Sequence, residues 1–446
     1  MQLGTAPATS PIGPVEQLRE RIASRTAQIG IVGLGYVGLP TAVAYAQAGF
    51  PVTGIDLDIR RCASINSGRS HVEDIDDATL KPLVREGRLR AVRSVELAGD
   101  LDVVDVCVPT PLDKSREPDL SAIVAVVDVL RPLLRPGQLI VLTSTTYPGT
   151  TEEIVLPAIE GAGLRVGEDI FLAFAPERID PGNKAYTLRT TPKVVGGITP
   201  ACTEIAAALF STIIDQVVTV SNATAAEMTK LLENTFRSIN IGLANEVAIM
   251  CHHLGIDVWE VIRAASTKPY GFMPFFPGPG LGGHCIPIDP SYLAWKLRRL
   301  NYTARFIDLA NEINRHMPEY VVTRVAELLN EAERSIRASR ILLLGMAYKR
   351  DVGDLRESPA LDIAALLARR GAEVAYADPH VPAVRHEELA LEAVPLTPEL
   401  LTAQNLVLVT TDHAAFDWPM VRDHARLVLD TRGTAHGAGR PTWHLL

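Results

Sequence analysis

Short, largely apolar segments alternate with helical patterns through the first half of the chain. They lie at residues 29–32, 52–55, 102–108, 138–142 and 171–175; the first is followed by glycines and the other four stop at polar or proline-containing residues. Apolar runs of this length, separated by helix-like spacing, are typical of parallel strands that are buried on both faces of a sheet. The pattern therefore predicts an α/β domain with a doubly wound parallel sheet.

A much longer helical pattern follows between Ser221 and Gly255. At the standard rise such a helix would be roughly 45 Å long. Thr224 and Glu227 have the T-x-x-E spacing of a capping box, which predicts the start of the helix. A helix of this length suits a region that bridges domains or packs against a second subunit.

The last third of the chain repeats the α/β pattern after a long helical segment at residues 303–335, in which Pro318 predicts a kink or break. A strand, a loop, a helix capped by Ser358-Pro359, a glycine, a strand and an aspartate then follow. We expect an α/β fold of two Rossmann-like doubly wound domains joined by a long-helix central region. The expected divisions are an N-terminal arm at 1–25, a first domain at 26–220, a central helical region at 221–320 and a last domain at 321–446.

The composition narrows the class of protein. The chain has 446 residues, enough for two or three domains, and its net charge of −9 argues against binding to nucleic acid. No apolar run reaches the length of a membrane span, and the N-terminus lacks the order of a signal peptide. The five cysteines are scattered without a C-x-x-C pair, which fits a reducing compartment and no structural zinc. We expect a cytoplasmic protein with no metal and no membrane contact.

A dinucleotide fingerprint lies in the first strand–helix–strand unit. Gly33, Gly35 and Gly38 form G-x-G-x-x-G directly after the first predicted strand, and Asp56 ends the second. These glycines permit a tight turn and close approach of a pyrophosphate to the helix N-terminus. The acid would bind ribose hydroxyls and repel a 2′-phosphate, so NAD is favoured over NADP, although Arg60 and Arg61 weaken that preference. The alternative is a glycine-rich turn that only helps packing.

Three polar residues follow successive strands of this first domain. Thr110, Thr145 and Glu177 each stand just beyond a predicted strand end. Ligands of open parallel sheets lie beyond the carboxyl ends of the strands. Each residue alone could equally be a turn or cap residue, but three at equivalent positions indicate a site.

The segment from Phe276 to Pro290 is rich in glycine and proline and contains Cys285 and Asp289. Such a composition excludes a strand or helix interior and predicts a tightly turned loop whose bare backbone can approach an anion. A thiol in such a loop is a candidate nucleophile. The alternatives are a plain surface turn and a small buried hydrophobic residue.

Two polar residues of the long helix, Lys230 and Asn234, are four apart and share one face. A cation and an amide presented together are the components of an oxyanion site. A solvated helix face is the alternative.

These residues, taken in order, resemble the UDP-glucose/GDP-mannose dehydrogenase family over nearly the whole chain. The shared motifs are GLGYVGLP at 33–40, VPTP at 108–111, STT at 144–146, APER at 175–178, K-x-x-x-N at 230–234, GGHCIPIDP at 282–290 and GMAYKRDVGDLRESPA at 345–360. The resemblance implies an N-terminal NAD-binding domain, a helical centre that forms a homodimer, and a C-terminal domain that binds the UDP part of a UDP-sugar substrate.

The resemblance also implies a two-step, four-electron oxidation of a sugar C6 alcohol to a carboxylate with two NAD reduced. Cys285 would attack the intermediate aldehyde and form first a thiohemiacetal and then a thioester, which water hydrolyses. Lys230 and Asn234 would stabilise the oxyanion, and Asp289 would act with Lys230 on the water. Thr145 would position that water and Glu177 would assist hydrolysis.

Further binding roles follow from the same resemblance. The implied cofactor-binding residues are Gly33, Gly35, Tyr36, Val37, Gly38, Asp56, Arg61, Thr110, Thr145 and Arg356. The implied substrate-binding residues are Glu177, Arg178, Lys230, Asn234, Gly280, Gly282, Gly283, Lys349 and Lys268. Among them the backbone of 278–283 would hold the phosphates, Lys349 would reach the UDP, Arg356 would reach the cofactor or the other subunit, and Lys268 would cross between subunits.

One departure bears on the sugar. UDP-glucose dehydrogenases usually carry a second glutamate four residues after the first, and here that position is Pro181, with Asp180 one residue earlier. The E-R-x-x-P-G-N form at 177–183 is similar to the branch that oxidises UDP-N-acetylhexosamines, and the aromatic segment 270–276 suits a bulkier sugar. We therefore expect UDP-N-acetylglucosamine, then UDP-N-acetylmannosamine, with UDP-glucose as a further alternative.

Two other functions fit part of the pattern. A two-electron hydroxyacid dehydrogenase also joins a dinucleotide domain to a helix with Lys and Asn, but it needs no cysteine and would form one NADH per substrate. A non-catalytic dinucleotide-binding regulator would bind NAD without turning over any UDP-sugar.

Overall fold

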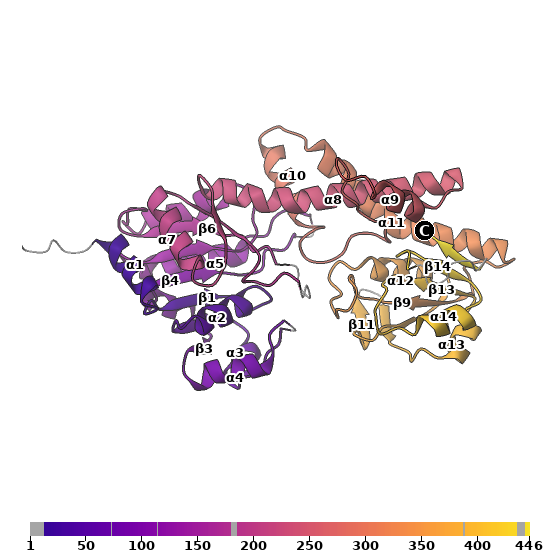
Figure 1. The fold of residues 1–446 in the computed structure, drawn as a ribbon, viewed down its shortest axis with the longest axis horizontal. Coiled ribbons are helices and arrows are strands. Elements are labelled where there is room, and N and C mark those ends of the chain that lie inside the picture. The colour runs from indigo at the N-terminus through magenta and orange to yellow at the C-terminus, as the bar shows by residue number, and fades with distance from the viewer. Residues whose placement is uncertain (1–12, 73, 114, 180–184, 387–388, 435–441) are drawn as a thin grey trace, which may run out of the picture. The chain divides into compact units, whose positions relative to one another are not determined.

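The computed structural model describes residues 13–446 except 73, 114, 180–184, 387–388 and 435–441. The chain forms two compact units, Met1–Leu232 and Glu233–Leu446, each built around its own sheet (Figure 1). Most of the predicted N-terminal arm, and Asp180 to Asn183 of the sequence departure, lie outside the described residues. The expected α/β class with two Rossmann-like sheets and a long central helix is confirmed.

The first unit contains an eight-stranded sheet in the order β3-β2-β1-β4-β5-β6-β7-β8. The first six strands run parallel, β7 is antiparallel to β6, and β8 is parallel to β7. The strands are β1 (Ile29–Val32), β2 (Val52–Ile55), β3 (Leu89–Val92), β4 (Val103–Val106), β5 (Leu139–Leu142), β6 (Phe171–Phe174), β7 (Lys193–Gly197) and β8 (Val217–Thr219). The chain order reverses between β1 and β4, which is the switch point where such sheets bind ligands.

Helices cover both faces of this sheet (Figure 1). Alternate residues of β1 enter different cores: Ile29 and Ile31 pack on one face and Val32 on the other, which explains why the strand is apolar throughout. The helices are α1 (Pro14–Ala23), α2 (Gly38–Gln47), α3 (Ile59–Asn66), α4 (Asp77–Arg85), α5 (Ser121–Leu130), α6 (Leu156–Glu160) and α7 (Pro200–Phe210). Shorter helical turns occupy Val95–Asp100, Arg131–Leu133 and Thr151–Val155.

The long helix α8 (Ala223–Leu254) forms where it was predicted, but the predicted capping box is wrong. Asn222 caps the helix, because its side-chain oxygen accepts from the Ala225 N–H at 2.8 Å. Thr224 instead donates to Glu152 at 3.1 Å. Glu227 is fully buried and accepts hydrogen bonds from Gly149 and Thr151 of another segment, so tertiary contacts replaced the local ones.

The second unit contains a five-stranded parallel sheet in the order β10-β9-β13-β14-β15, and a separate antiparallel hairpin. The sheet strands are β9 (Arg340–Leu344), β10 (Glu373–Ala377), β13 (Leu406–Val409), β14 (Val428–Asp430) and β15 (Trp443–Leu445), and the hairpin strands are β11 (Ala383–His386) and β12 (Leu389–Glu392). Residues of α11 (Arg305–Glu331) and α12 (Pro359–Arg369) pack on one face of the sheet. Residues of α13 (Pro398–Ala403) and α14 (Trp418–His424) pack on the other.

Two local predictions in this unit need correction. Helix α11 continues through Pro318, so the break predicted there is wrong; Pro318 is buried within the helix. Ser358 does precede α12, but its hydroxyl donates to the Met346 carbonyl at 2.7 Å instead of capping the helix. The remaining helices, α9 (Val258–Ala265) and α10 (Asp289–Arg299), flank the cysteine-containing loop in the sequence.

Within the described part of the chain, no helix combines the length and apolar character needed to cross a membrane.

Candidate active site

The fingerprint glycines of the first unit are required for two different reasons. Gly33 has φ +93°, and a Cβ there would lie 2.5 Å from the Cys107 carbonyl oxygen; a Cβ on Gly38 would lie 1.8 Å from the Gly33 carbonyl oxygen. Packing alone therefore demands glycine at both positions. A Cβ on Gly35 would meet no protein atom within 4 Å. The fold does not need glycine at 35, whereas close approach of a pyrophosphate does.

Asp56 follows β2 and is buried at the same edge of the sheet. Its carboxylate accepts from the N–H groups of Leu34 and Asp58, both at 2.9 Å, and from the Arg61 guanidinium at 3.3 Å. Arg61 thus lies beside the acid, as the sequence led us to expect. Tyr36 is half exposed and Val37 stands directly before α2. These residues fit a dinucleotide whose ribose meets Asp56 and whose pyrophosphate meets the α2 N-terminus.

The three polar residues at strand ends share one edge of the sheet. Thr110 follows β4, Thr145 follows β5 and Glu177 follows β6, and these three strands are adjacent and parallel. Thr110 is buried, whereas Thr145 and Glu177 are partly exposed. Their common edge is therefore established, while their roles stay predictions.

Glu177 is held by protein donors on both oxygens. One oxygen accepts from the N–H groups of Arg178 at 2.7 Å and Ile179 at 2.9 Å, and the other accepts from the Lys193 ammonium at 3.0 Å. Burial alone would raise the pKa of Glu177, but Lys193 and these donors together hold it below its usual value.

Lys193 was not among the site residues predicted from the sequence, where the only signal was a lysine at the start of an apolar strand. The Arg178 guanidinium donates to the Pro192 carbonyl at 2.6 Å.

Lys230 and Asn234 lie one turn apart on α8, as predicted. Lys230 is 8% exposed, so a freely solvated helix face is not its environment. One turn earlier, burial raises the pKa of Glu227 to about 7, although the Thr151 hydroxyl and the backbone donors of Gly149 and Thr151 lower it. Lys230 is thus preceded on its own helix by a buried carboxyl group that anchors the helix to the segment 149–151.

Cys285 lies on the turn that leads into α10 and is exposed, while Cys62, Cys202 and Cys251 are buried. The Cys285 carbonyl accepts from the Asp289 N–H at 2.8 Å, so residues 285–289 form one hydrogen-bonded turn with the cysteine at its start and the aspartate at its end. Asp289 is 2% exposed, and its carboxylate accepts a hydrogen bond from the Asn234 side-chain amide. The structure therefore brings the side chains of Asp289 and Asn234 together one turn of chain after an exposed cysteine residue, and the buried alternative for Cys285 is wrong.

The glycines before Cys285 pack against the loop after β9. A Cβ on Gly282 would lie 2.5 Å from Tyr348 Cβ, and one on Gly283 would lie 2.8 Å from the Tyr348 ring. The Gly283 N–H donates to the Arg356 carbonyl at 2.9 Å. Packing thus explains Gly282 and Gly283 in part, and the Gly283 N–H is not available to a phosphate. Among the described residues, no hydrogen bond occupies the N–H groups of Gly280 and Gly282.

Arg432 is a cation that the sequence-based site omitted. Its Nη1 lies 3.2 Å from the position that a Cβ on Gly278 would take, and its Nε donates to the Thr410 carbonyl at 2.7 Å. Burial lowers the pKa of Arg432. It follows β14 just as the other candidate residues follow their strands, and that position is the signal that could have found it.

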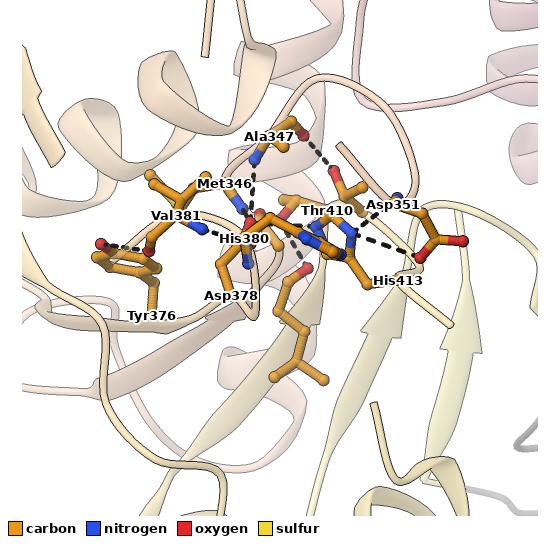
Figure 2. A network of polar contacts seen from close by, with 12 residues as sticks. Met346, Ala347, Asp351, Tyr376, Asp378, His380, Val381, Thr410 and His413 are labelled. Atoms are coloured by element: carbon orange, nitrogen blue, oxygen red, sulfur yellow. Dashed lines mark hydrogen bonds and ion pairs between the residues drawn. The ribbon is translucent and has the colours of Figure 1, made fainter. Parts of the chain in front are cut away.

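The loop that carries Lys349 is anchored on both sides by a buried network (Figure 2). On one side Asp378 accepts from the Met346 N–H at 2.7 Å and from His413 at 3.1 Å. On the other, the second His413 ring nitrogen accepts from the Asp351 N–H at 2.9 Å. Asp378 and His413 are inaccessible to solvent, and hydrogen bonding lowers the pKa of Asp378 despite its burial. Asp378 ends β10 as Asp56 ends β2, but its side chain is fully buried and accepts five hydrogen bonds from protein groups, which leaves no lone pair for a ribose.

Asp351, His380 and His413 form the one group among the described residues with metal-ligand proximity. Both His413 nitrogens take part in the hydrogen bonds just given (Figure 2). A neutral imidazole has one donor and one acceptor nitrogen, so no lone pair is left for an ion. The group is explained as part of the loop anchor.

Two predicted cations have local partners. The Arg356 guanidinium makes paired hydrogen bonds to the nearby Asp354, with Nη2 at 2.6 Å. The Lys268 ammonium lies 5.1 Å from the centre of the Tyr270 ring.

Comparison with known proteins gives matches along the chain. The UDP-glucose/GDP-mannose dehydrogenase family matches with its NAD-binding domain over residues 27–214, its central domain over 224–316 and its UDP-binding domain over 342–436. The UDP-N-acetyl-D-mannosamine dehydrogenase of Yersinia pestis is 35% identical over 91% of this chain and 98% of its own. The NDP-N-acetyl-D-galactosaminuronic acid dehydrogenase of Ralstonia nicotianae is 35% identical over 91% and 95%. Among solved structures, UDP-D-ManNAc dehydrogenase from Pyrococcus horikoshii superposes with a TM-score of 0.84 at 32% identity, covering 94% of this chain and 98% of that one.

Proposed function

The chain belongs to the UDP-glucose/GDP-mannose dehydrogenase family and is an NAD-dependent nucleotide-sugar dehydrogenase, and on that premise we propose that it oxidises the C6 hydroxyl of a UDP-N-acetylhexosamine to a carboxylate. The observation that carries the proposal is an exposed Cys285 one turn before a buried Asp289, which is hydrogen-bonded to Asn234. A two-electron dehydrogenase has no use for this thiol, whereas a four-electron oxidation needs a group that retains the aldehyde.

Each residue of the site has one task in this proposal. The Cys285 thiolate attacks the aldehyde carbon to form a thiohemiacetal, which becomes a thioester on loss of a second hydride. Lys230 and Asn234 stabilise the negative oxygen that develops on that carbon. Asp289 holds the Asn234 amide in place. NAD, when bound by the first domain, would supply the hydride acceptor for each of the two oxidations.

Hydrolysis of the thioester completes the cycle. Thr145 positions a water molecule and Glu177 accepts its proton as the water oxygen attacks the carbonyl carbon. The carbon–sulfur bond then breaks, and the Cys285 thiolate leaves. Glu177 suits this task because its pKa is held low, so that the carboxylate is ionised at neutral pH.

We assign the binding of the two nucleotides to different domains. Residues 26–220 would bind NAD, residues 221–320 would supply the central helices and residues 321–446 would bind the UDP part. The open N–H groups of Gly280 and Gly282, together with Lys349 and Arg432, supply the donors that a diphosphate requires.

The sugar class is supported by two features. The relatives reported above are named for N-acetylmannosamine and N-acetylgalactosaminuronic acid, which supports an N-acetylhexosamine and gives no support to the UDP-N-acetylglucosamine first expected. We therefore propose UDP-N-acetylmannosamine as the first candidate. Aromatic side chains precede the cysteine loop: Phe275 packs edge-on against Phe236, and Phe276 stacks on Trp259. A rigid aromatic wall suits an N-acetyl group.

The homodimer remains part of the proposal. Phe236, Leu243, Met250 and Leu254 are exposed on α8 at intervals of seven, seven and four residues, which is one helix face. Phe306 and Leu309 of α11 are also exposed. Apolar side chains repeated along a helix face suit a partner helix with the same chemistry, and a second copy of the chain supplies one.

The test is a spectrophotometric NADH assay with UDP-N-acetylmannosamine, UDP-N-acetylglucosamine, UDP-N-acetylgalactosamine and UDP-glucose. Two NADH per sugar and a uronic acid product are expected with one of the N-acetylated sugars. One NADH per substrate would instead identify a two-electron dehydrogenase. NAD binding without turnover of any of the four would identify a regulator.

A further inference from the structure

Lys193 is a cation with almost no access to water. It opens β7, is 4% exposed as a residue, and its ammonium group lies 3.0 Å from Glu177 Oε2. The same group lies 5.1 Å from the centre of the Phe210 ring. Long ammonium side chains normally extend into solvent, so burial of this one against a single carboxylate indicates a specific task.

The surroundings make that carboxylate depend on the lysine. Asp105 on β4 is 1% exposed, and within the described residues its Oδ2 has no hydrogen-bond partner. Burial raises the pKa of Asp105 to about 6, with Lys193 acting in the opposite direction and Glu177 in the same one. The other titratable groups here, the buried Tyr45 and the partly buried Cys107, also have pKa values raised mainly by desolvation and by the charge of Asp105. Lys193 therefore supplies positive charge to a region that otherwise holds carboxyl, thiol and phenol groups.

We propose that Lys193 is a positioning residue that keeps Glu177 ionised and aimed so that Glu177 can accept the proton of the water that hydrolyses the thioester. The inference rests on the proposed function. In the step concerned, water adds to the thioester carbonyl, its proton passes to Glu177 and the Cys285 thiolate is expelled, with no change of oxidation state. Lys193 touches none of the reacting atoms and acts through Glu177.

The geometry explains why the lysine cannot be replaced by the backbone donors alone. The N–H groups of Arg178 and Ile179 both serve Oε1. Lys193 is the donor that the structure gives to Oε2. Without Lys193, the Glu177 carboxylate, whose side chain is only 12% exposed, would lose its counter-charge. A poorly solvated carboxylate without a counter-charge takes up a proton and loses its capacity as a base.

The experiment compares Lys193→Met and Lys193→Arg with Glu177→Gln and the double variant Lys193→Met/Glu177→Gln. Rapid mixing with the UDP-sugar separates the NADH formed before hydrolysis from the steady state, and intact-protein mass detects the thioester on Cys285. For Lys193→Met we expect a normal burst, a steady state slower by about 100-fold as for loss of a general base, accumulation of the thioester, and recovery of the rate as pH rises. Lys193→Arg should stay near the wild-type rate.

The double variant keeps the test decisive if Lys193→Met alone does not fold. Removal of both charges leaves neither partner of the Lys193–Glu177 pair as an unpaired ion, and Asp105, whose pKa is already raised to about 6, can take up a proton. The double variant should therefore fold and hydrolyse at the rate of Glu177→Gln. A further loss in the double variant, or a wild-type hydrolysis rate in Lys193→Met, overturns the inference. Failure of the proposed function is distinct, because the wild type itself would then yield no burst and no second NADH.

Discussion

The side-chain amide of Asn234 donates a hydrogen bond to the buried carboxylate of Asp289, which follows Cys285 by four residues. This hydrogen bond holds Asn234, a candidate oxyanion donor on α8, against the loop that contains Cys285.

Replacement of Asn234 by Ala removes the amide donor and leaves the Asp289 carboxylate without this hydrogen bond. For Asn234→Ala we expect kcat to fall by about 100-fold to 1000-fold, with NAD affinity unchanged when measured by titration. A loss confined to NAD affinity would contradict the assignment. Asn240→Ala, six residues later on the same helix, is the control.

Cys285→Ser should reduce the rate of uronic acid formation by several orders of magnitude. A serine hydroxyl is ionised far less often than a thiol at neutral pH, and an alkoxide is a poorer leaving group than a thiolate. NAD binding should persist. The measurement is product analysis with NAD titration on the same sample. Cys62→Ala, which removes a buried thiol of α3, is the matched control and should keep full activity. Near-normal turnover by Cys285→Ser would remove the covalent mechanism.

Glu227 makes stability depend on pH in a defined window. Its pKa is about 7 in the folded chain against an ordinary 4.5. The folded state therefore retains a proton that the unfolded state releases, so the free energy of unfolding falls as pH rises from about 4.5 to 7, by about 3 kcal/mol in all. Glu227→Gln cannot titrate. In denaturant unfolding we expect the wild type to lose stability relative to Glu227→Gln as pH rises across that window. Glu152 is a neighbouring exposed carboxylate, and the free energy of unfolding of Glu152→Gln should change with pH as that of the wild type does. A constant difference would rule out the buried titration.

The anchor beneath Lys349 should control affinity for the sugar nucleotide. His413→Phe fills the same buried space but loses both ring hydrogen bonds, to Asp378 and to the Asp351 N–H. We expect the KM for the UDP-sugar to rise about 10-fold, the scale of one or two lost hydrogen bonds, with little change in kcat or in the KM for NAD. Steady-state kinetics with each substrate varied decides this. His424→Ala, at the exposed end of α14, should leave all three constants unchanged. An equal rise in the KM for NAD would mean a general loss of structure.

The exposed apolar face of α8 predicts the oligomeric state. Leu243→Asp places a charge in the middle of that face and should convert the proposed dimer to a monomer, measured by light scattering during gel filtration. Leu97→Asp, an exposed leucine of the first unit, should leave the mass unchanged. A wild-type chain that is already monomeric would end the proposal.

Much of this architecture was predictable from local sequence. Five of the eight strands of the first sheet (β1, β2, β4, β5 and β6) and the whole of α8 were predicted from apolar spacing, because buried parallel strands and long helices have a clear periodicity. Strands β3, β7 and β8 were not predicted. The position of Thr110, Thr145 and Glu177 at one edge of the sheet was predictable from the same apolar pattern, because each follows the end of a predicted strand. The capping box failed because Glu227 meets Gly149 and Thr151, which lie far away in sequence.

Lys193 and Arg432 escaped notice for a related reason. Each is a single cation with no motif around it, and its importance arises only when the sheet order brings β7 beside β6, or the end of β14 beside the glycine loop. Contacts between residues that are far apart in the sequence form only in the tertiary fold, so the local spacing of residues does not predict them. His413 illustrates the same limit, since a lone histidine in sequence became the central member of the loop anchor.

Gly35 carries a consequence for the evolution of this chain. Its backbone is not left-handed, and a Cβ there would touch nothing. Alanine at such a position generally makes a protein more stable by about 0.4–1 kcal/mol, because it restricts the unfolded chain. A lineage selected for thermal resistance alone would drift toward alanine at 35, whereas one selected for turnover would retain glycine. The residue at this position therefore records which of the two pressures has been stronger.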